Sequence, residues 1–137
     1  MPHTLTYTFD RPVTPEQLQP LFEQTTWAKG RSAEDIQHML DHTTSCLTVW
    51  QGDRLVGFAR VITDDVYRGL LDDVIVDTDL RGQGVGAAII AHIIARFSHL
   101  EELLLGCLDH MVPFYEKLGF KIEGHPHMAI KNLAHRH

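Results

Sequence analysis

Residues 81–87, with the sequence Arg-Gly-Gln-Gly-Val-Gly-Ala, constrain the fold of this 137-residue chain more than any other segment. The segment follows a strand-like apolar run and precedes apolar residues at helical spacing. Glycine accepts positive φ and lets a backbone approach a ligand closely. Successive amide groups in such a turn, with a helix N-terminus behind them, form a concave anion site, and Arg81 adds a cation at its rim. The segment therefore predicts a strand–loop–helix unit that binds a pyrophosphate.

Two helices are expected in the N-terminal third. Thr14, Pro15 and Gln17 form a capping box with proline at the first helical position, so a helix begins there and ends near Thr25. Ser32, with an acid three residues later, begins a second helix that runs to about residue 40.

Strand patterns and two further helices complete an α+β chain. Helices are expected over residues 84–97 and 111–118, the latter ended by Gly119. Strands are expected at residues 5–9, 46–50, 55–63, 70–76 and 103–107, and residues 121–130 are expected to supply a last strand or hairpin. The three central strands form an antiparallel meander, and one βαβ crossover runs from Val76 to Leu103. The expected fold is a layered α/β/α domain with helices on both faces of a mixed sheet.

Composition excludes several functional classes. The length fits one domain over residues 1–137, and the formal charge of −6 argues against a nucleic-acid surface. No apolar run reaches the length of a membrane span and no secretory signal pattern begins the chain, so we expect a cytoplasmic protein without a membrane partner. The histidines show no metal-ligand spacing with cysteine or carboxylate partners, so we expect no metal.

A dinucleotide-binding loop is the main alternative for the glycine segment. Gly82, Gly84 and Ala87 satisfy the Rossmann spacing, and Asp109 could serve as the ribose acid. The meander before the loop lacks the alternating strands and helices of that fold, and about 50 residues after the loop are too few for a doubly wound sheet.

Three segments together resemble the GCN5-related N-acetyltransferase (GNAT) superfamily. Residues 74–86 are similar to its acetyl-CoA motif, residues 113–120 (PFYEKLGF) to its C-terminal motif, and residues 55–60 to the strand before the core strand. Trp27, Arg31 and residues 59–64 resemble a small bacterial branch related to plastid acetyltransferases that act on arylalkylamines and protein amines. The resemblance implies a mostly antiparallel sheet of six to seven strands with a splayed central parallel pair.

The resemblance also implies roles for individual residues. The strand residues Val74, Ile75 and Val76 would bind the pantetheine arm, and the main chain of Arg81, Gly82, Gln83, Gly84, Val85 and Gly86 would bind the pyrophosphate. Phe114 and Tyr115 belong to the cofactor site as well, and Tyr115 matches the tyrosine near the thioester sulfur. Leu108 stands where many members carry a pantetheine-binding asparagine, which puts one cofactor contact in doubt.

The chemistry needs a base for the amine and a proton donor for the leaving thiolate. Tyr115 suits the donor, with ordinary packing of a helix aromatic as the alternative. Asp73 is the preferred base. The alternative, in which Asp73 positions the amine or caps a loop without taking a proton, stays open. Asp72 and His110 are rival bases; as strand neighbours, Asp72 and Asp73 are expected to face opposite sides, so that at most one faces the cleft.

These patterns predict an N-acetyltransferase that moves an acetyl group from acetyl-CoA to a small-molecule or peptide primary amine in a ternary complex. Cys46 and Cys107 lie in no nucleophile setting, so an acyl-enzyme is not expected. Trp27 could line the acceptor pocket or lie in the core. A clustered set of acids, Asp64, Asp65, Asp72 and Asp73, could attract a cation or form a solvated turn. A non-catalytic acyl-CoA-binding module is the alternative function, and a homodimer is compatible with the family.

Overall fold

The computed structural model describes residues 4–131, whose contacts gather into two compact units, residues 4–107 and 108–131. Each unit is described by itself. The expectation of a single domain over residues 1–137 stays a prediction.

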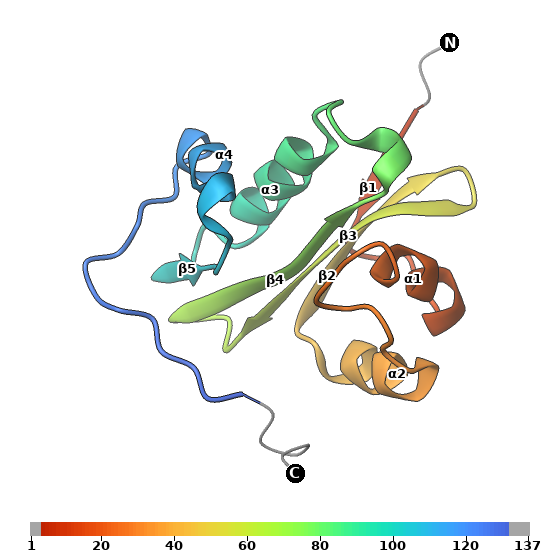
Figure 1. Cartoon of the computed structure of the whole chain (residues 1–137), viewed down its shortest axis with the longest axis horizontal. Helices are drawn as coiled ribbons and strands as arrows, with labels where there is room; N and C mark the ends of the chain where they lie inside the picture. Colours follow the sequence, from red (N-terminus) through yellow and green to blue (C-terminus); the bar gives the residue numbers. More distant parts are fainter. Residues whose placement is uncertain (1–3, 132–137) are drawn as a thin grey trace. The chain divides into compact units, whose positions relative to one another are not determined.

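The first unit is built on one mixed sheet (Figure 1). Its strands follow the order β1-β2-β3-β4-β5 and are β1 (Thr6–Thr8), β2 (Ser45–Gln51), β3 (Arg54–Thr63), β4 (Arg68–Val76) and β5 (Glu102–Leu104). The first four strands pair antiparallel, and β4 pairs with β5 in parallel. The predicted meander and the predicted βαβ crossover are therefore both confirmed.

Both predicted helix starts in the N-terminal third are confirmed. In α1 (Pro15–Phe22) the Thr14 side chain accepts from the Gln17 amide while the Gln17 side chain accepts from the Thr14 amide. In α2 (Ala33–His42) the Ser32 hydroxyl accepts from the Asp35 amide. Each cap satisfies a backbone donor that the first helical turn leaves free, so a short local sequence is enough to specify the start.

Helices cover both faces of the sheet (Figure 1). On one face, α1 and α2 pack on Trp50, Phe58 and Ile75 in a single apolar cluster. On the other face lies α3 (Val85–Arg96), whose Ile89 approaches Gly57 of β3. A β-carbon on Gly57 would lie 2.9 Å from a methyl carbon of Val49 in β2 and 3.2 Å from Ile89, so glycine at this position makes room for both the neighbouring strand's side chain and the helix.

The parallel pair separates soon after it forms. β4 pairs with β5 only from Arg68 to Leu70, opposite Glu102 to Leu104. β5 then ends, whereas β4 continues to Val76. Within the described residues, the outer edge of β4 therefore has no strand partner over residues 71–76, which agrees with the expected splayed pair.

The second unit contains the 3-10 helix η2 (Asp109–Met111) and α4 (Val112–Lys117). Gly119 follows α4 with a φ of 105°, as predicted for a glycine that ends a helix. The predicted last strand is wrong for residues 121–131, which form no strand and are all exposed. Pro126 lies in this segment, and proline cannot donate to a strand ladder. The described residues thus form five strands, and the expected six to seven are not confirmed.

Within residues 4–131, no helix combines the length and apolar character needed to cross a bilayer.

Candidate active site

The glycine segment forms the expected turn between strand and helix. β4 ends at Val76, the 3-10 helix η1 spans Thr78–Leu80, and α3 begins at Val85. Gly82 and Gly84 have φ of 79° and 83°, a region that side chains with a β-carbon disfavour. Added β-carbons at these glycines would meet nothing within 4 Å, so backbone conformation rather than crowding selects glycine.

The N-terminus of α3 presents free donors. Gly84 is its N-cap and has no side-chain capping bond, and the first helical bond runs from the Ala88 amide to the Gly84 carbonyl. Among the described residues, the amides of residues 82–87 donate to no protein group. Several adjacent unpaired donors at the positive end of a helix favour an anionic group such as a phosphate.

A buried carboxylate fixes the start of this loop. One Asp77 oxygen accepts from the Asp79 amide at 2.9 Å, and the other accepts from Arg54 at 3.0 Å and Gln24 at 3.2 Å. Burial raises the pKa of Asp77, but these hydrogen bonds and the Arg54 charge outweigh burial and leave the pKa below its usual range. Asp77 is therefore an anion that ties the loop to β3 and to the end of α1.

The free edge of β4 adjoins the loop. The Asp77 amide donates to the Val56 carbonyl of β3. Because backbone groups alternate along a strand, those of Val76 point away from β3, toward the unpaired edge. Arg81 reaches back to this edge, and its Nε donates to the Val76 carbonyl at 3.2 Å.

Asp73 occupies a β-bulge in the middle of β4. Phe58 pairs with Ile75 and Arg60 pairs with Asp72, so two β4 residues oppose the single Ala59. Asp73 has a φ of 51°, a conformation that aspartate tolerates better than most residues. Bulges bend a strand and redirect its side chains.

This bulge corrects the expectation that Asp72 and Asp73 face opposite sides. Both carboxylates accept from the same guanidinium: Arg60 Nε donates to Asp73 at 2.8 Å, and an Arg60 terminal nitrogen donates to Asp72 at 3.1 Å. The alternation rule holds for a regular strand and fails here because the extra residue rotates the chain.

Asp73 is almost fully enclosed by donors. Besides Arg60, its oxygens accept from Arg31 at 2.9 Å and from the indole nitrogen of Trp27 at 3.0 Å, and its side chain is 1% exposed. Burial raises the pKa of Asp73, but the hydrogen bonds and charges of both arginines outweigh burial, so the pKa is lowered. A lowered pKa makes the carboxylate a weak base. These contacts oppose proton abstraction by Asp73, and its role in the reaction stays a prediction.

The sequence did not predict that the side chains around Asp73 come from Trp27, Arg31 and Arg60. Trp27 is 57% exposed, so it does not lie in the core. The segment that joins α1 to α2 carries Trp27 and Arg31, and no periodicity there signals a contact with a strand more than 40 residues away.

The motif residues of the second unit lie on and beside α4. Tyr115 is buried, and its ring packs edge-to-face with Phe114 at 5.0 Å and Phe120 at 5.8 Å between centroids. Leu108, at the position where many family members carry asparagine, is 71% exposed. His110 lies in η2. The catalytic roles of Tyr115 and His110 and the cofactor-binding roles of Phe114 and Tyr115 stay predictions.

Comparison with known proteins identifies the family. A family model described as an acetyltransferase (GNAT) domain matches residues 9–132. The chain belongs to this family.

Individual relatives agree with the resemblance to plastid proteins. An uncharacterized N-acetyltransferase, ycf52, of Porphyra purpurea is 28% identical over 110 residues, which cover 76% of this chain and 63% of the relative. The chloroplastic serotonin N-acetyltransferase 2 of rice is 29% identical over 113 residues, which cover 76% of this chain and 54% of the relative. The chain thus spans less than two thirds of the length of these curated relatives.

Solved structures confirm the GNAT fold. A GNAT-family acetyltransferase from Streptococcus pneumoniae superimposes with a TM-score of 0.82 at 22% identity, covering 95% of this chain and 99% of that one. A GNAT-family protein from Xanthomonas campestris superimposes with a TM-score of 0.77 at 28% identity, and the match covers 90% of this chain and 88% of that one.

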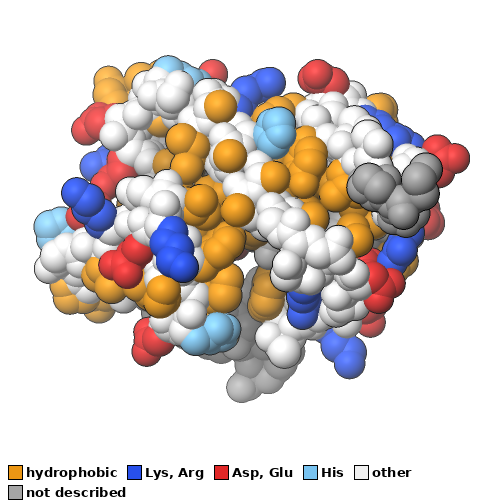
Figure 2. Space-filling model, turned by 90° about the horizontal axis from the view of Figure 1, so that it is seen from above, with side chains coloured by type: hydrophobic (Ala, Val, Ile, Leu, Met, Phe, Trp, Pro, Cys, Tyr) orange, Lys and Arg blue, Asp and Glu red, His pale blue; other side chains and the backbone are white. Residues whose placement is uncertain are grey.

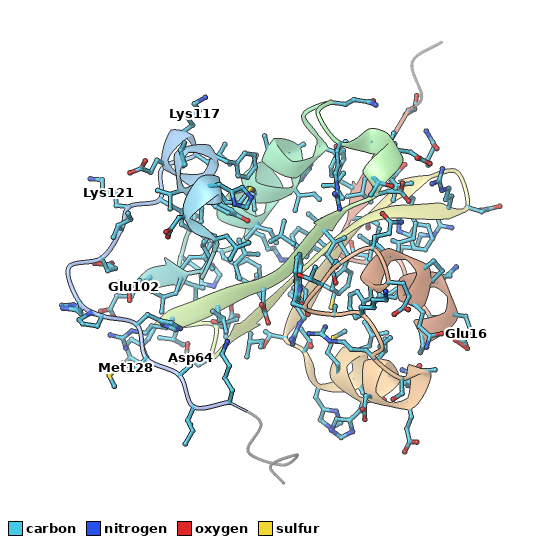
Figure 3. The ribbon with its side chains drawn as sticks, viewed as in Figure 1. Glu16, Asp64, Glu102, Lys117, Lys121 and Met128 are labelled. Carbon is cyan, nitrogen blue, oxygen red and sulfur yellow. The ribbon has the colours of Figure 1, made fainter. Side chains whose placement is uncertain are left out.

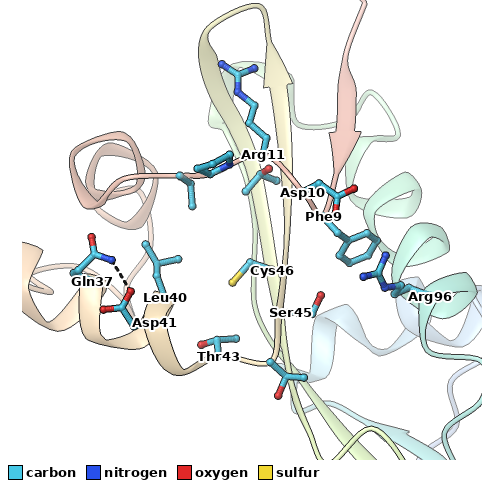
Figure 4. A pocket seen from close by; sticks show the side chains of 14 residues that line it. Phe9, Asp10, Arg11, Gln37, Leu40, Asp41, Thr43, Ser45, Cys46 and Arg96 are labelled. Atoms are coloured by element: carbon cyan, nitrogen blue, oxygen red, sulfur yellow. Dashed lines mark hydrogen bonds between the residues drawn. The ribbon is translucent and has the colours of Figure 1, made fainter.

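Two hollows of the first unit lie away from the glycine segment. One, of about 400 Å³, lies between the start of β2 and the end of α2 and includes Cys46 (Figure 4). Burial raises the pKa of Cys46 to about 11, with Arg60 lowering it and Asp73 raising it, so the thiolate is scarce at neutral pH. The other hollow, of about 590 Å³, lies between α1 and the start of α2. Residues 81–86 line neither.

The acidic turn after β3 is structural. Asp64, labelled in Figure 3, accepts from the amides of Val66 and Tyr67 at 3.0 and 2.8 Å, and these hydrogen bonds lower its pKa. Asp65 pairs with His99 at 2.6 Å. Neither carboxylate belongs to the Asp73 cluster. On the face seen in Figure 2, charged side chains of both signs are interspersed among the described residues.

Proposed function

We propose that this chain is an acetyl-CoA-dependent N-acetyltransferase that transfers an acetyl group to a primary amine by direct attack in a ternary complex. The observation that carries the proposal is the run of unpaired amides at the N-terminus of α3, beside the unpaired edge of β4. The amides suit the pyrophosphate of coenzyme A. The strand edge, including Val74, Ile75 and Val76, suits the amide groups of the pantetheine arm, which would add to the sheet like a strand.

The reaction needs few protein groups. The nitrogen lone pair of the amine attacks the thioester carbonyl carbon, a C–N bond forms, and the C–S bond breaks. The amine loses a proton, and the departing thiolate gains one. We assign the proton donor to Tyr115, because it matches the family tyrosine and a phenol has a reference pKa of about 10. We assign Asp73 a positioning role, because its lone pairs already bind three donors.

A direct transfer is favoured over an acyl-enzyme. A covalent intermediate would need an activated nucleophile, and the raised pKa of Cys46 opposes thiolate formation. The rice relative is named a serotonin N-acetyltransferase, which supports an amine as the acceptor class. The homodimer and the cytoplasmic location stay predictions.

The glycine loop offers a sharp test with a matched control. In Gly84→Ala the new β-carbon meets open space but the backbone must leave or strain its φ of 83°, so the amides lose their arrangement. Gly52→Ala, in the turn between β2 and β3, also meets open space at a φ of 63° and carries a similar backbone penalty far from the loop. Calorimetric titration with acetyl-CoA should show binding weakened about 10-fold or more only in Gly84→Ala, the loss of roughly one charge-assisted hydrogen bond.

Turnover separates the two candidate functions. Release of free thiol from acetyl-CoA in the presence of primary amines supports the enzyme. Tight acetyl-CoA binding without thiol release over aliphatic, aromatic and peptide amines supports a binding module, which the exposed Leu108 at the usual asparagine position favours. No calorimetric signal with any CoA thioester overturns both.

The donor role of Tyr115 has its own test. Tyr115→Phe removes one hydroxyl and keeps the ring that packs on Phe114 and Phe120. We expect kcat to fall about 100-fold, the lower end for loss of general acid catalysis, while acetyl-CoA affinity changes little. Equal losses in kcat and affinity would assign the hydroxyl to binding instead.

A further inference from the structure

The loop residues 77–81 pair their amides before the free donors begin at residue 82. All but one of these amides donate to main-chain carbonyls or to the Asp77 side chain, namely those of Asp77, Asp79, Leu80 and Arg81. The exception is the Thr78 amide, which donates to the side-chain oxygen of Gln24 at 2.9 Å. Gln24 lies 54 residues earlier in the chain, so a distant side chain holds the start of the loop.

Gln24 uses both ends of its side-chain amide. Its oxygen accepts from the Thr78 amide, and its nitrogen donates to a carboxylate oxygen of Asp77 at 3.2 Å. The two contacts fall on consecutive residues, so together they fix the position and the rotation of the peptide that joins Asp77 to Thr78. A side-chain amide supplies a donor and an acceptor on one planar group, whereas a carboxylate would lack the donor and add a second anion beside Asp77.

The main chain that carries Gln24 is held by the core. The hydroxyl of Thr25 donates to the Phe22 carbonyl at 2.8 Å and accepts from the Ala28 amide at 2.9 Å. Phe22 and Ala28 are fully buried in the apolar cluster that α1 and α2 form on the sheet. The turn after α1 therefore has little freedom to move, and Gln24 passes its fixed position on to the loop.

Packing does little to hold the glycine segment itself. Added β-carbons at Gly82 and Gly84 would meet no atom within 4 Å, and glycine gives the backbone more conformational freedom than other residues. The direction of the amides in this segment then depends on the hydrogen bonds at its two ends. Donors that already point at a ligand bind it more tightly, because less conformational entropy is lost on binding.

We infer that Gln24 is a positioning residue for the cofactor: through the peptide between Asp77 and Thr78, it aims the unpaired amides of residues 82–87 at the pyrophosphate of acetyl-CoA. Under the proposed function, on which this inference rests, part of the acetyl-CoA affinity comes from the turn after α1, a segment that no cofactor motif includes. Loss of the Gln24 contacts should therefore weaken acetyl-CoA binding and leave the chemical step intact.

The first experiment compares one substitution at two glutamines. Gln24→Met removes both contacts with the loop and keeps the length of the side chain. Gln19→Met is the matched control, because Gln19 lies on α1, is half-buried like Gln24 and donates to the Arg31 carbonyl at 3.4 Å. We expect calorimetric titration to show the Kd for acetyl-CoA raised about 5-fold in Gln24→Met, the cost of roughly one hydrogen bond, and unchanged in Gln19→Met.

The outcomes separate this inference from the proposed function. Equal acetyl-CoA affinities of the two variants overturn the inference, while binding by the wild type still supports the proposed function. No binding by the wild type overturns the proposed function itself. In assays of thiol release with a primary amine, kcat of Gln24→Met at saturating acetyl-CoA should stay within about 2-fold of the wild type. A fall in kcat as large as the loss of affinity would show a general disturbance of the fold and refute a positioning role.

Gln24→Glu tests the Asp77 contact with almost no change in shape. The carboxylate can still accept from the Thr78 amide, but it cannot donate to Asp77 and is repelled by it. We expect the Kd for acetyl-CoA at neutral pH to rise by about 5-fold or more. An affinity equal to that of the wild type would refute the contribution of the Asp77 contact.

Nuclear magnetic resonance can follow the loop in the free protein. The amide resonances of Gly82, Gly84 and Gly86 should shift in both Gln24 variants and stay in place in Gln19→Met, because only Gln24 contacts the loop. Loop resonances that do not move in the Gln24 variants, or that move equally in the control, would overturn the inference.

Discussion

Asp73→Asn should destabilise the fold by removing a buried charge and one hydrogen-bond acceptor. Asparagine has nearly the shape of aspartate and tolerates the φ of 51° at this bulge, so the backbone is little affected. The substitution removes the anion that Arg31, Arg60 and Trp27 share. It also turns one acceptor into an amide that cannot accept from a guanidinium.

The size of the loss follows from the burial of the partners. Removing one partner of a fully buried ion pair costs roughly 3–5 kcal/mol, because the other charge is left unpaired. The side chains of Arg31 and Arg60 are 33% and 15% exposed, so water can partly solvate both guanidinium charges when the carboxylate is removed. We therefore expect Asp73→Asn to lower the free energy of unfolding by about 2–3 kcal/mol at pH 7.

The pH dependence gives an independent check. The folded-state pKa of Asp73 is lowered, so its contribution to stability is complete above the unfolded-state pKa of about 4 and is lost as the pH falls through the folded-state pKa. In that window the unfolded chain binds more protons than the folded chain. The stability difference between the wild type and Asp73→Asn should therefore shrink in acid.

Urea denaturation from pH 3 to pH 7, followed by fluorescence, measures both effects. Asp73→Ala serves as a companion variant, because alanine at this φ adds about 1–2 kcal/mol of backbone cost. An Asn variant within about 0.5 kcal/mol of the wild type, the usual range for surface changes, would refute the ion-pair argument. A fall in kcat of about 100-fold or more with unchanged stability and acceptor KM would restore Asp73 as the base.

Two further predictions concern packing and thiol reactivity. Gly57→Ala should lower the free energy of unfolding by about 1–3 kcal/mol, since its β-carbon would lie 2.9 Å from Val49 and 3.2 Å from Ile89. A neutral effect in urea denaturation would show that both the Val49 side chain and α3 can move away. Cys46, with its pKa of about 11, should react with iodoacetamide at pH 8 about 100-fold more slowly than an ordinary cysteine. Mass spectrometry can compare it with the exposed Cys107, and equal rates for the two would contradict the burial of Cys46.

The sequence by itself determined the features that depend on neighbouring residues. The capping box of α1, the Ser32 cap of α2, the glycine after α4 and the positive φ of Gly82 and Gly84 follow from hydrogen bonds and backbone preferences within a few residues. The family resemblance added the splayed parallel pair beside the loop.

Only the tertiary structure decided which side chains meet. The bulge at Asp73 places two neighbouring carboxylates on one guanidinium, against the alternation expected of a regular strand. Trp27 and Arg31 reach the same carboxylate across more than 40 residues of chain. Residues 121–131 formed no strand although their pattern favoured one. The contacts of the Asp73 bulge depend on partners distant in sequence, which local preference cannot specify.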